Sequence, residues 1–403
     1  MKLIAKSAFR RKFPLQVPRS RSSSRALGVI WLGAFSFSAL AGCARQAPVV
    51  TEPPHLAARE RIVTPDEVTT EPELADRAER ALAEHRWEDA AAAYHVLTSA
   101  YPAGPRASEY WLNLGLAMEG LRNTQGARDT YLDVARRFPD VPAAGVALVH
   151  AATLDAYLED WPALGAIGAQ ILARTDLDDI ERIVGLGARG LSRAEQGDDQ
   201  GATPDVLDAL DLADRHHYGP KDVLPVAVAQ AQFALGEIRR IRSERIVIDP
   251  PTVDFLEKLE ERAGGLLDAQ TAYSMTLGSA DPHWAAMAGL RVASMYRALH
   301  HDVLAIPPPA NMKTTREKQA FYVLMHVRYR ILLEKGLRQI QQTIALGERT
   351  YESSTWLDRA REIEKEMQRV LAEEKDRLSA MPYTEDQAKE ALRIVEKKVS
   401  APK

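Results

Sequence analysis

A pattern of small and aromatic residues recurs in this chain after 37 residues, and it constrains the fold more than any other feature. The two copies share an alanine, a tyrosine four residues later and a closing aromatic-proline pair: Ala90, Tyr94 and Tyr101-Pro102, then Ala127, Tyr131 and Phe138-Pro139. Alanine lets two helices approach closely, the tyrosine fills the space beside them, and proline ends the second helix. The interval therefore predicts stacked pairs of antiparallel helices.

The second copy resembles the tetratricopeptide repeat (TPR) at its signature positions, in order: Trp111, Leu114, Gly115, Met118, Ala127, Tyr131 and Pro139. We expect Gly115 and Ala127 where the two helices cross, with the larger side chains packed around them. Two departures stand out. The interval is 37 residues rather than the usual 34, which implies longer helices or loops, and Arg122 stands where a turn glycine is usual.

Two further hairpins follow. The third keeps a small residue at Ala152 and starts its second helix at Asp160-Trp161-Pro162, although Leu164 and Gly168 replace the alanine and the aromatic residue. The fourth is expected from Glu181 to Gln196 and from Pro204 to His216, with the acidic turn 197–201 between its helices and Thr203-Pro204 capping the second.

Beyond residue 218 the helices lengthen and the strict period is lost. Proline and glycine stops predict helices at about 222–244, 252–277, 282–304, 313–349, 354–380 and 384–398, with capping boxes at Thr314/Glu317 and Thr384/Gln387. The fold class we expect is all-α: a TPR-like α-solenoid of helical hairpins followed by long antiparallel helices.

Residues 225–370 also resemble the C-terminal half of TPR proteins from the envelopes of gliding bacteria. The resemblance rests on Gly236-Glu237, Ala269-x3-Tyr273, Pro282-x-Trp284, the proline run 307–309 and Trp356. Some members of that group belong to a gliding-motility complex. Most of these elements are packing residues, so the resemblance says more about family than about role.

The N-terminus has the three parts of an export signal: a basic leader, the apolar segment Ala26–Leu40, and small residues at Ala41 and Gly42. The apolar segment has 15 residues, against roughly 17–25 for a spanning helix. Leu40-Ala41-Gly42-Cys43 resembles the bacterial lipoprotein signal. The resemblance implies cleavage before Cys43, the only cysteine, with diacylglyceryl and acyl (palmitate-type) lipid on that residue.

Ala44 follows the cysteine at the position where an aspartate would favour retention in the inner membrane of many Gram-negative bacteria. The expected location is therefore the outer membrane, facing the periplasm. The expected segments are a signal peptide (1–42), a lipidated Pro-rich tether (43–72), TPR-like hairpins (73–218) and a long-helix domain (219–403). The tether could reach about 100 Å when fully extended at ~3.3–3.6 Å per residue.

Without residues 1–42 the chain has 44 Lys and Arg against 56 Asp and Glu, a net charge of −12. An acidic surface argues against a nucleic-acid partner and against binding anionic lipid by charge. Membrane attachment must then come from the acyl chains. With Cys43 committed to lipid, stability has to come from packing rather than from disulfides.

No catalytic signature stands out. The chain has no Gly-rich phosphate loop and no serine elbow. His216-His217 and His300-His301 are adjacent pairs, whereas a helical metal site needs ligands three or four residues apart, so we expect surface or helix-end histidines. We expect Glu260/Glu261 and Glu373/Glu374 to face solvent, and the acidic stretch 195–199 to be a solvated turn rather than a calcium site. We therefore expect no enzyme activity, no cofactor, no metal and no small-molecule substrate.

What remains is surface. Stacked hairpins commonly grip a partner peptide or helix on the face lined by their first helices. Carrying TPR groove positions onto this chain points to Glu79, Glu109, Leu112, Leu116 and Glu119 as partner-binding residues. The alternative is that these are ordinary solvent or inter-repeat positions.

Three functions fit these observations. The leading hypothesis is a non-enzymatic outer-membrane lipoprotein that scaffolds protein partners in an envelope assembly, such as gliding or other trans-envelope machinery. A second is an assembly factor of the barrel-assembly or secretin-pilotin type, whose members are also lipid-anchored TPR proteins. The third, a cell-wall enzyme or its activator, would need an active site hidden in the C-terminal helices.

Overall fold

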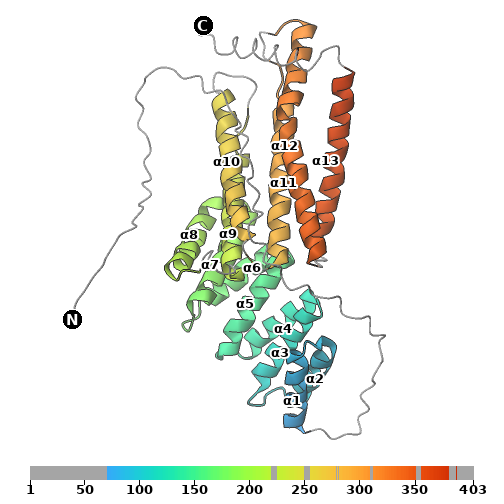
Figure 1. The fold of residues 1–403 in the computed structure, drawn as a ribbon. Coiled ribbons are helices and arrows are strands. Elements are labelled where there is room, and N and C mark those ends of the chain that lie inside the picture. Colours follow the sequence, from blue (N-terminus) through green and yellow to red (C-terminus); the bar gives the residue numbers. More distant parts are fainter. Residues whose placement is uncertain are drawn as a thin grey trace, which may run out of the picture. The chain divides into compact units, whose positions relative to one another are not determined.

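The structure is a computed structural model that describes residues 70–218, 225–248, 255–277, 279, 281–308, 312–350, 355–380 and 387. These residues form thirteen helices, and their order along the chain is shown in Figure 1. The signal peptide, Cys43, the tether as far as residue 69 and the helix expected at 384–398 lie outside the described residues. The all-α fold predicted from the sequence is confirmed for the part described.

The first eight helices form four hairpins. Their bounds are α1 Glu71–Ala83, α2 Trp87–Ala100, α3 Ala107–Gly120, α4 Thr124–Arg137, α5 Pro142–Tyr157, α6 Trp161–Leu172, α7 Asp179–Glu195 and α8 Asp199–Arg215. Each helix packs against the next one along the chain, which is the arrangement predicted for stacked hairpins. The third hairpin, whose signature is weakest, is formed like the others.

One turn is repeated in all four hairpins and makes the 37-residue interval visible in the backbone. The turn residue has a positive φ in each: His85 (57°), Arg122 (58°), Glu159 (59°) and Gly197 (85°). The next amide donates to a carbonyl five residues back, as Asn123 N does to Met118 O at 2.9 Å. This is the Schellman ending of a helix, where glycine is the usual residue. Three hairpins therefore keep the turn geometry without the turn glycine.

The predicted helix crossings are present. A Cβ on Gly115 would lie 2.4 Å from the Tyr131 ring, and one on Gly190 would lie 2.5 Å from Val206, at the same 16-residue separation. In the third hairpin the small residue is Gly168, which approaches the backbone of α7 at Gly185. Hairpin contacts in this chain therefore depend on one missing side chain at each crossing.

The C-terminal helices are α9 Val226–Glu244, α10 Phe255–Thr276, α11 Pro282–Leu304, α12 Thr315–Arg349 and α13 Thr355–Ser379. The capping box at Thr314/Glu317 is confirmed. Helices α9 and α10 reuse the crossing of the repeats, because a Cβ on Gly236 would lie 2.5 Å from the Tyr273 ring. The long helices α11, α12 and α13 pack side by side (Figure 1).

Two local predictions need correction. Thr203-Pro204 does not cap the second helix of the fourth hairpin, because α8 already begins at Asp199 and Pro204 lies inside it. The cap is Asp198, whose side chain accepts from Gly201 N at 2.8 Å. The hairpin array also begins slightly earlier than expected: α1 starts at Glu71, and the Glu73 carboxylate accepts from the Thr70 amide at 3.0 Å.

The apolar core does not stop at residue 218. One cluster of buried residues continues from Ala127 in α4 to Met367 in α13, and a smaller one fills the first hairpins. Trp284 and Trp356 are fully buried in the larger cluster. Within the described ranges, no helix is both long enough and apolar enough to cross a membrane.

Candidate functional site: the first-helix face

The first helices of the hairpins, α1, α3, α5 and α7, can be aligned by their turn residues. Counting back 13, 10, 6 and 3 residues from Arg122 gives Glu109, Leu112, Leu116 and Glu119 on α3. These spacings follow one side of a helix. We call the surface formed by these positions on α1, α3 and α5 the first-helix face. All five residues predicted to bind a partner belong to it.

Two of the predicted acidic residues share one arginine. The Arg106 guanidinium, at the start of α3, donates to Glu109 Oε2 at 2.9 Å and also to Glu79 of α1. The hydrogen bond from Arg106 holds the pKa of Glu109 below its ordinary value. Both carboxylates are at least 44% exposed, so this inter-repeat contact remains in solvent. It ties α1 to α3 along the edge of the first-helix face.

The other end of α3 is tied to α5. Glu119 Oε1 lies 3.2 Å from His150 Nδ1, and the His150 ring stacks on Tyr131 at 4.9 Å between centroids. Burial raises the pKa of Tyr131, and the negative charge of Glu119 raises it further. Glu119 thus links neighbouring hairpins, and it stays partly exposed.

Aliphatic side chains lie between these charged ends. Leu112 and Leu116 of α3 are half-buried and pack against the core. On α5, counting back from Glu159 places Val146 and Val149 in the same register, and Val146 is 41% exposed. The first-helix face therefore has an aliphatic floor with carboxylates at its margins.

The same register is closed in the fourth hairpin. Counting back from Gly197 gives Val184, Gly187, Leu191 and Ala194, all of them buried. Val184 is 2% exposed, against 41% for Val146. Helix α9 covers this part of α7, since a Cβ on Gly187 would lie 3.6 Å from the Ala231 side chain. The first-helix face is thus open on three hairpins and covered on the fourth.

Helices α11 and α13 attach at the border between the open and the covered parts. Arg359 of α13 donates to Glu159 at 2.6 Å, and the Tyr157 hydroxyl donates to Asp281 at the start of α11. The His283 ring lies 4.0 Å from the Tyr157 ring. These contacts join residues 124 and 200 positions apart, which sequence patterns cannot pair.

A buried ionic network lies behind this border. Arg291 of α11 donates to Glu195 of α7 and to Glu237 of α9, each at 2.7 Å. Arg240 and the Tyr273 hydroxyl also donate to Glu237, at 2.6 and 2.8 Å. Burial alone would raise the pKa of the fully buried Glu237, but the two arginines hold it below its ordinary value. Glu195 is raised in pKa by burial and by the charge of Glu237. We attribute a structural role to this network.

Two predictions about titratable residues are wrong. His300 is buried rather than at the surface, and so is Glu374. Glu374 Oε1 lies 3.0 Å from His300 Nε2 and 2.9 Å from His326 Nδ1, which joins α13 to α11 and α12. Burial alone would raise the pKa of Glu374, but hydrogen bonds from the two imidazoles bring it to about 2. The carboxylate therefore stays ionised inside the three-helix contact.

The remaining candidates behave as predicted. His216, His217 and His301 are exposed, and His216 Nε2 lies 2.9 Å from an Asp179 carboxylate oxygen. In the acidic turn, Asp198 caps α8 and Asp199 pairs with Arg242 at 2.8 Å, so both carboxylates serve the fold. Among the residues that the structure describes, no three His, Cys, Asp or Glu side chains are grouped to hold a metal ion.

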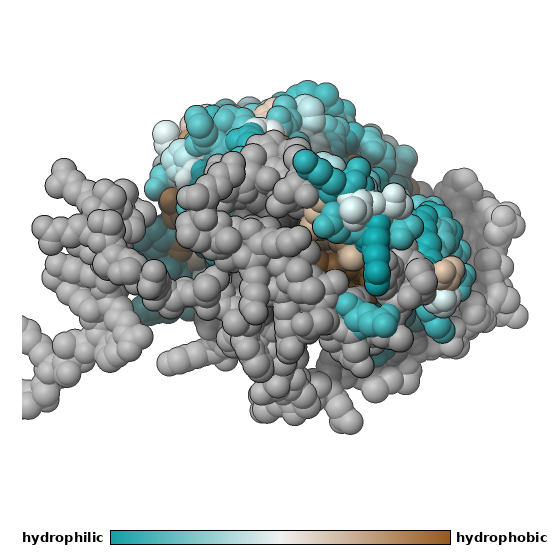
Figure 2. All heavy atoms as spheres, turned by 90° about the horizontal axis from the view of Figure 1, so that it is seen from above, coloured by the Kyte–Doolittle hydropathy of each residue, from teal (hydrophilic) through white to brown (hydrophobic). Residues whose placement is uncertain are grey.

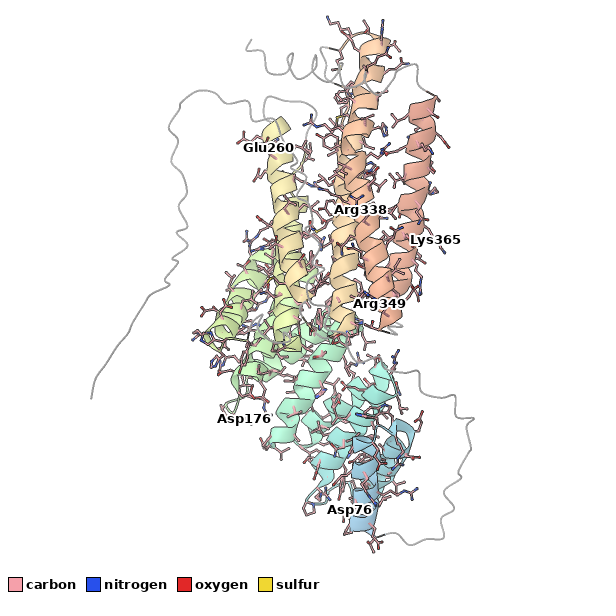
Figure 3. The ribbon with its side chains drawn as sticks, viewed as in Figure 1. Asp76, Asp176, Glu260, Arg338, Arg349 and Lys365 are labelled. Atoms are coloured by element: carbon pink, nitrogen blue, oxygen red, sulfur yellow. The ribbon has the colours of Figure 1, made fainter. Side chains whose placement is uncertain are left out.

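Charge is distributed unevenly along the chain. Residues 70–218 contain 13 Arg and no Lys against 26 Asp and Glu, a net charge of −13, whereas residues 219–403 carry +2. Figure 3 shows charged side chains reaching outward on both parts, at Asp76 and Asp176 on the hairpins and at Arg338 and Lys365 on α12 and α13. From above, the described surface is mostly hydrophilic with small hydrophobic areas (Figure 2). Strong negative charge thus coincides with the open hairpins.

Comparison with known proteins gives little beyond the fold. No family model and no curated protein matches the chain. Among solved structures it is similar to a tetratricopeptide repeat protein from Parabacteroides merdae, with 13% identity over 74% of this chain and 98% of that chain, at a TM-score of 0.40. The assignment of a TPR-like fold rests here on the repeated turns and helix crossings of the chain itself.

Proposed function

We propose that this protein is a lipid-anchored, non-enzymatic docking scaffold of a bacterial cell-envelope assembly. In this proposal, protein partners bind the first-helix face of α1, α3 and α5, while lipid on Cys43 holds the chain at the outer membrane. The observation that carries the proposal is the contrast within one register: Val146 is 41% exposed and Val184 is 2% exposed. The chain buries this surface in one hairpin and leaves it open in three.

The composition of the open face favours a protein partner. An interface core needs apolar side chains that can be desolvated, with polar groups at the rim. Leu112, Leu116, Val146 and Val149 supply the first, and Glu79, Glu109 and Glu119 supply the second. The fold supports the same reading, because stacked hairpins present long surfaces to extended or helical segments.

Docking is tested by photo-crosslinking in cells. A crosslinking amino acid at Val146 should give specific adducts with a partner protein, whereas the same amino acid at Leu207 should give none above background. Leu207 is a matched control, since it is 50% exposed on the second helix of the fourth hairpin. Equal adducts at both positions would overturn the proposed docking face.

Anchoring is tested separately. The Cys43→Ala chain should leave the membrane fraction, because several acyl chains supply stable attachment that the acidic surface does not. If the Cys43→Ala chain stayed in the outer-membrane fraction, the lipoprotein proposal would be wrong. The docking proposal would survive that result, since the crosslinking experiment does not depend on the anchor.

A further inference from the structure

The kind of partner can be narrowed from the charges around the first-helix face. The hairpin region carries −13, and all 13 of its cations are arginines. Many of these arginines are already engaged: Arg128 lies 3.3 Å from Asp155, and Arg189 and Arg193 lie within 2.7 Å of Asp205. A partner that approaches these hairpins therefore meets a negative potential.

The same excess is present locally. On the first-helix face Glu79, Glu109 and Glu119 are served by one guanidinium, that of Arg106. Glu119 contacts His150, which adds no full charge while the imidazole is neutral. Two of the three carboxylates are on α3, ten residues apart, which is about 15 Å at ~1.5 Å per residue. Leu112 and Leu116 lie between them on the same side of the helix.

We infer that the first-helix face binds a basic segment of a partner protein, with Lys or Arg residues about 15 Å apart on either side of apolar side chains. This inference rests on the proposed docking function and adds the chemistry of its ligand. The apolar side chains of the segment cover Leu112, Leu116 and Val146, and its cations reach Glu109 and Glu119. Charge complementarity of this kind mainly raises the association rate and selects between partners.

The test uses two synthetic peptides of 15 residues with blocked ends. The basic peptide has two Lys residues ten positions apart and two Leu residues between them, and the control peptide has Glu in place of Lys. Binding to the full-length chain, purified in detergent, is measured by fluorescence anisotropy at low and high salt. The basic peptide should bind at least about tenfold more tightly, and its affinity should fall with salt.

The charge-reversed variant Glu109→Lys/Glu119→Lys separates the face from general attraction. It should lose affinity for the basic peptide by about tenfold and bind the acidic peptide instead. The matched control Glu88→Lys/Asp208→Lys makes the same change in net charge at exposed positions on α2 and α8, and it should keep the basic peptide. Circular dichroism verifies that both variants are folded.

Three results would overturn the inference: tighter binding of the acidic peptide to the unmodified chain, no binding of the basic peptide, or equal loss in both charge-reversed variants. None of these would decide the docking function itself, which depends on crosslinking at Val146 against Leu207. A partner that crosslinks at Val146 but does not compete with the basic peptide would leave docking intact and refute this ligand chemistry.

Discussion

The third and fourth hairpins have the same turn and the same helix register, yet they present opposite surfaces. On α5 the register residues Val146 and Val149 reach solvent, and on α7 their equivalents Val184 and Gly187 are covered by α9. The repeat alone thus does not determine where a partner can bind. The helices added after residue 218 close part of the face and leave a defined length of it open.

The two regions also hold their charges differently. The Arg106 pairs between α1 and α3 are exposed, whereas Glu237, in the network that holds α7, α9 and α11 together, is fully buried. Exposed pairs contribute about 0–1 kcal/mol, while breaking a buried pair costs about 3–5 kcal/mol because it leaves an uncompensated charge. Mutations should therefore have larger effects in the second region.

The largest effect is expected for Arg291→Met. It leaves Glu195 and Glu237 buried without their shared partner, and the free energy of unfolding should fall by about 3 kcal/mol or more. Chemical denaturation followed by circular dichroism measures the change. The control is Arg86→Met, whose pairs with Glu84 and Asp89 are exposed and whose loss should cost under about 1 kcal/mol. Similar losses in both variants would erase the contrast between the regions.

A pH-dependent effect is expected for Glu374→Gln. The pKa of Glu374 is about 2 in the folded chain, below its ordinary value near 4.5, so its contribution is complete above pH 4.5 and disappears as pH falls toward 2. The variant should lose up to about 3 kcal/mol at pH 7, and the difference from the unmodified chain should shrink between pH 4.5 and 2.

Exposed Glu373 beside it provides the control, because Glu373→Gln should change stability little at any pH. A difference between Glu374→Gln and the unmodified chain that stayed constant from pH 7 to pH 2 would mean that the buried carboxylate is not held ionised by His300 and His326.

The helix crossings should respond alike in both regions. Gly115→Ala and Gly236→Ala each place a Cβ about 2.5 Å from a tyrosine ring, which should cost about 1–3 kcal/mol through overpacking. Gly264→Ala on the open side of α10 meets nothing within 4 Å, so it should stabilise the helix by about 0.5–1 kcal/mol. Thermal melts of the three variants suffice. A stabilising Gly236→Ala would show that α9 and α10 do not share the crossing of the repeats.

The smallest effect is expected at the repeated turn. Arg122 has a φ of 58°, a conformation that costs a non-glycine residue about 1 kcal/mol. Arg122→Gly should therefore raise the melting temperature slightly, by a few tenths to about 1 kcal/mol in stability. Arg77→Gly, in the interior of α1, should lower it by about 1 kcal/mol. Destabilisation by both changes would argue against a strained turn at Arg122.

The sequence predicts the helices well because their signals are local. Small residues at crossings, prolines at helix ends and the capping box at Thr314 depend on neighbours within a few turns, and these predictions are confirmed. The turn at residues 85, 122 and 159 was hidden, because histidine, arginine and glutamate share no side-chain signal for a positive φ. Only the constant interval between them could have pointed to it.

The ionic contacts of the C-terminal region were missed for a different reason. Glu237 and Arg291 are 54 residues apart, and pairing them requires the packing of α9 against α11. Glu374 carried a usable signal, since it lies seven residues after buried Met367 and fourteen after buried Ala360, on the apolar side of α13. His300 likewise follows Tyr296 by one turn on the buried side of α11. A polar residue in an apolar register was the available clue.

For the partner-binding face, the sequence identified the positions but not which of them are open. The five predicted residues all lie on the first-helix face, and three of them also make inter-repeat contacts. Closure of the fourth hairpin depends on α9, α11 and α13, whose contacts with α5 and α7 are long-range. The limit of the open surface therefore required the structure.

The contrast between open and closed register positions can be measured directly with single cysteines. In a Cys43→Ala chain without other thiols, Val146→Cys and Val184→Cys occupy equivalent positions, 13 residues before their turn residues. Val146→Cys should react with a maleimide at close to the rate of the exposed control Leu207→Cys, and Val184→Cys at least about a hundredfold more slowly, since it needs local opening. Equal rates at Val146→Cys and Val184→Cys would contradict the claim that the C-terminal helices confine the docking face to α1, α3 and α5.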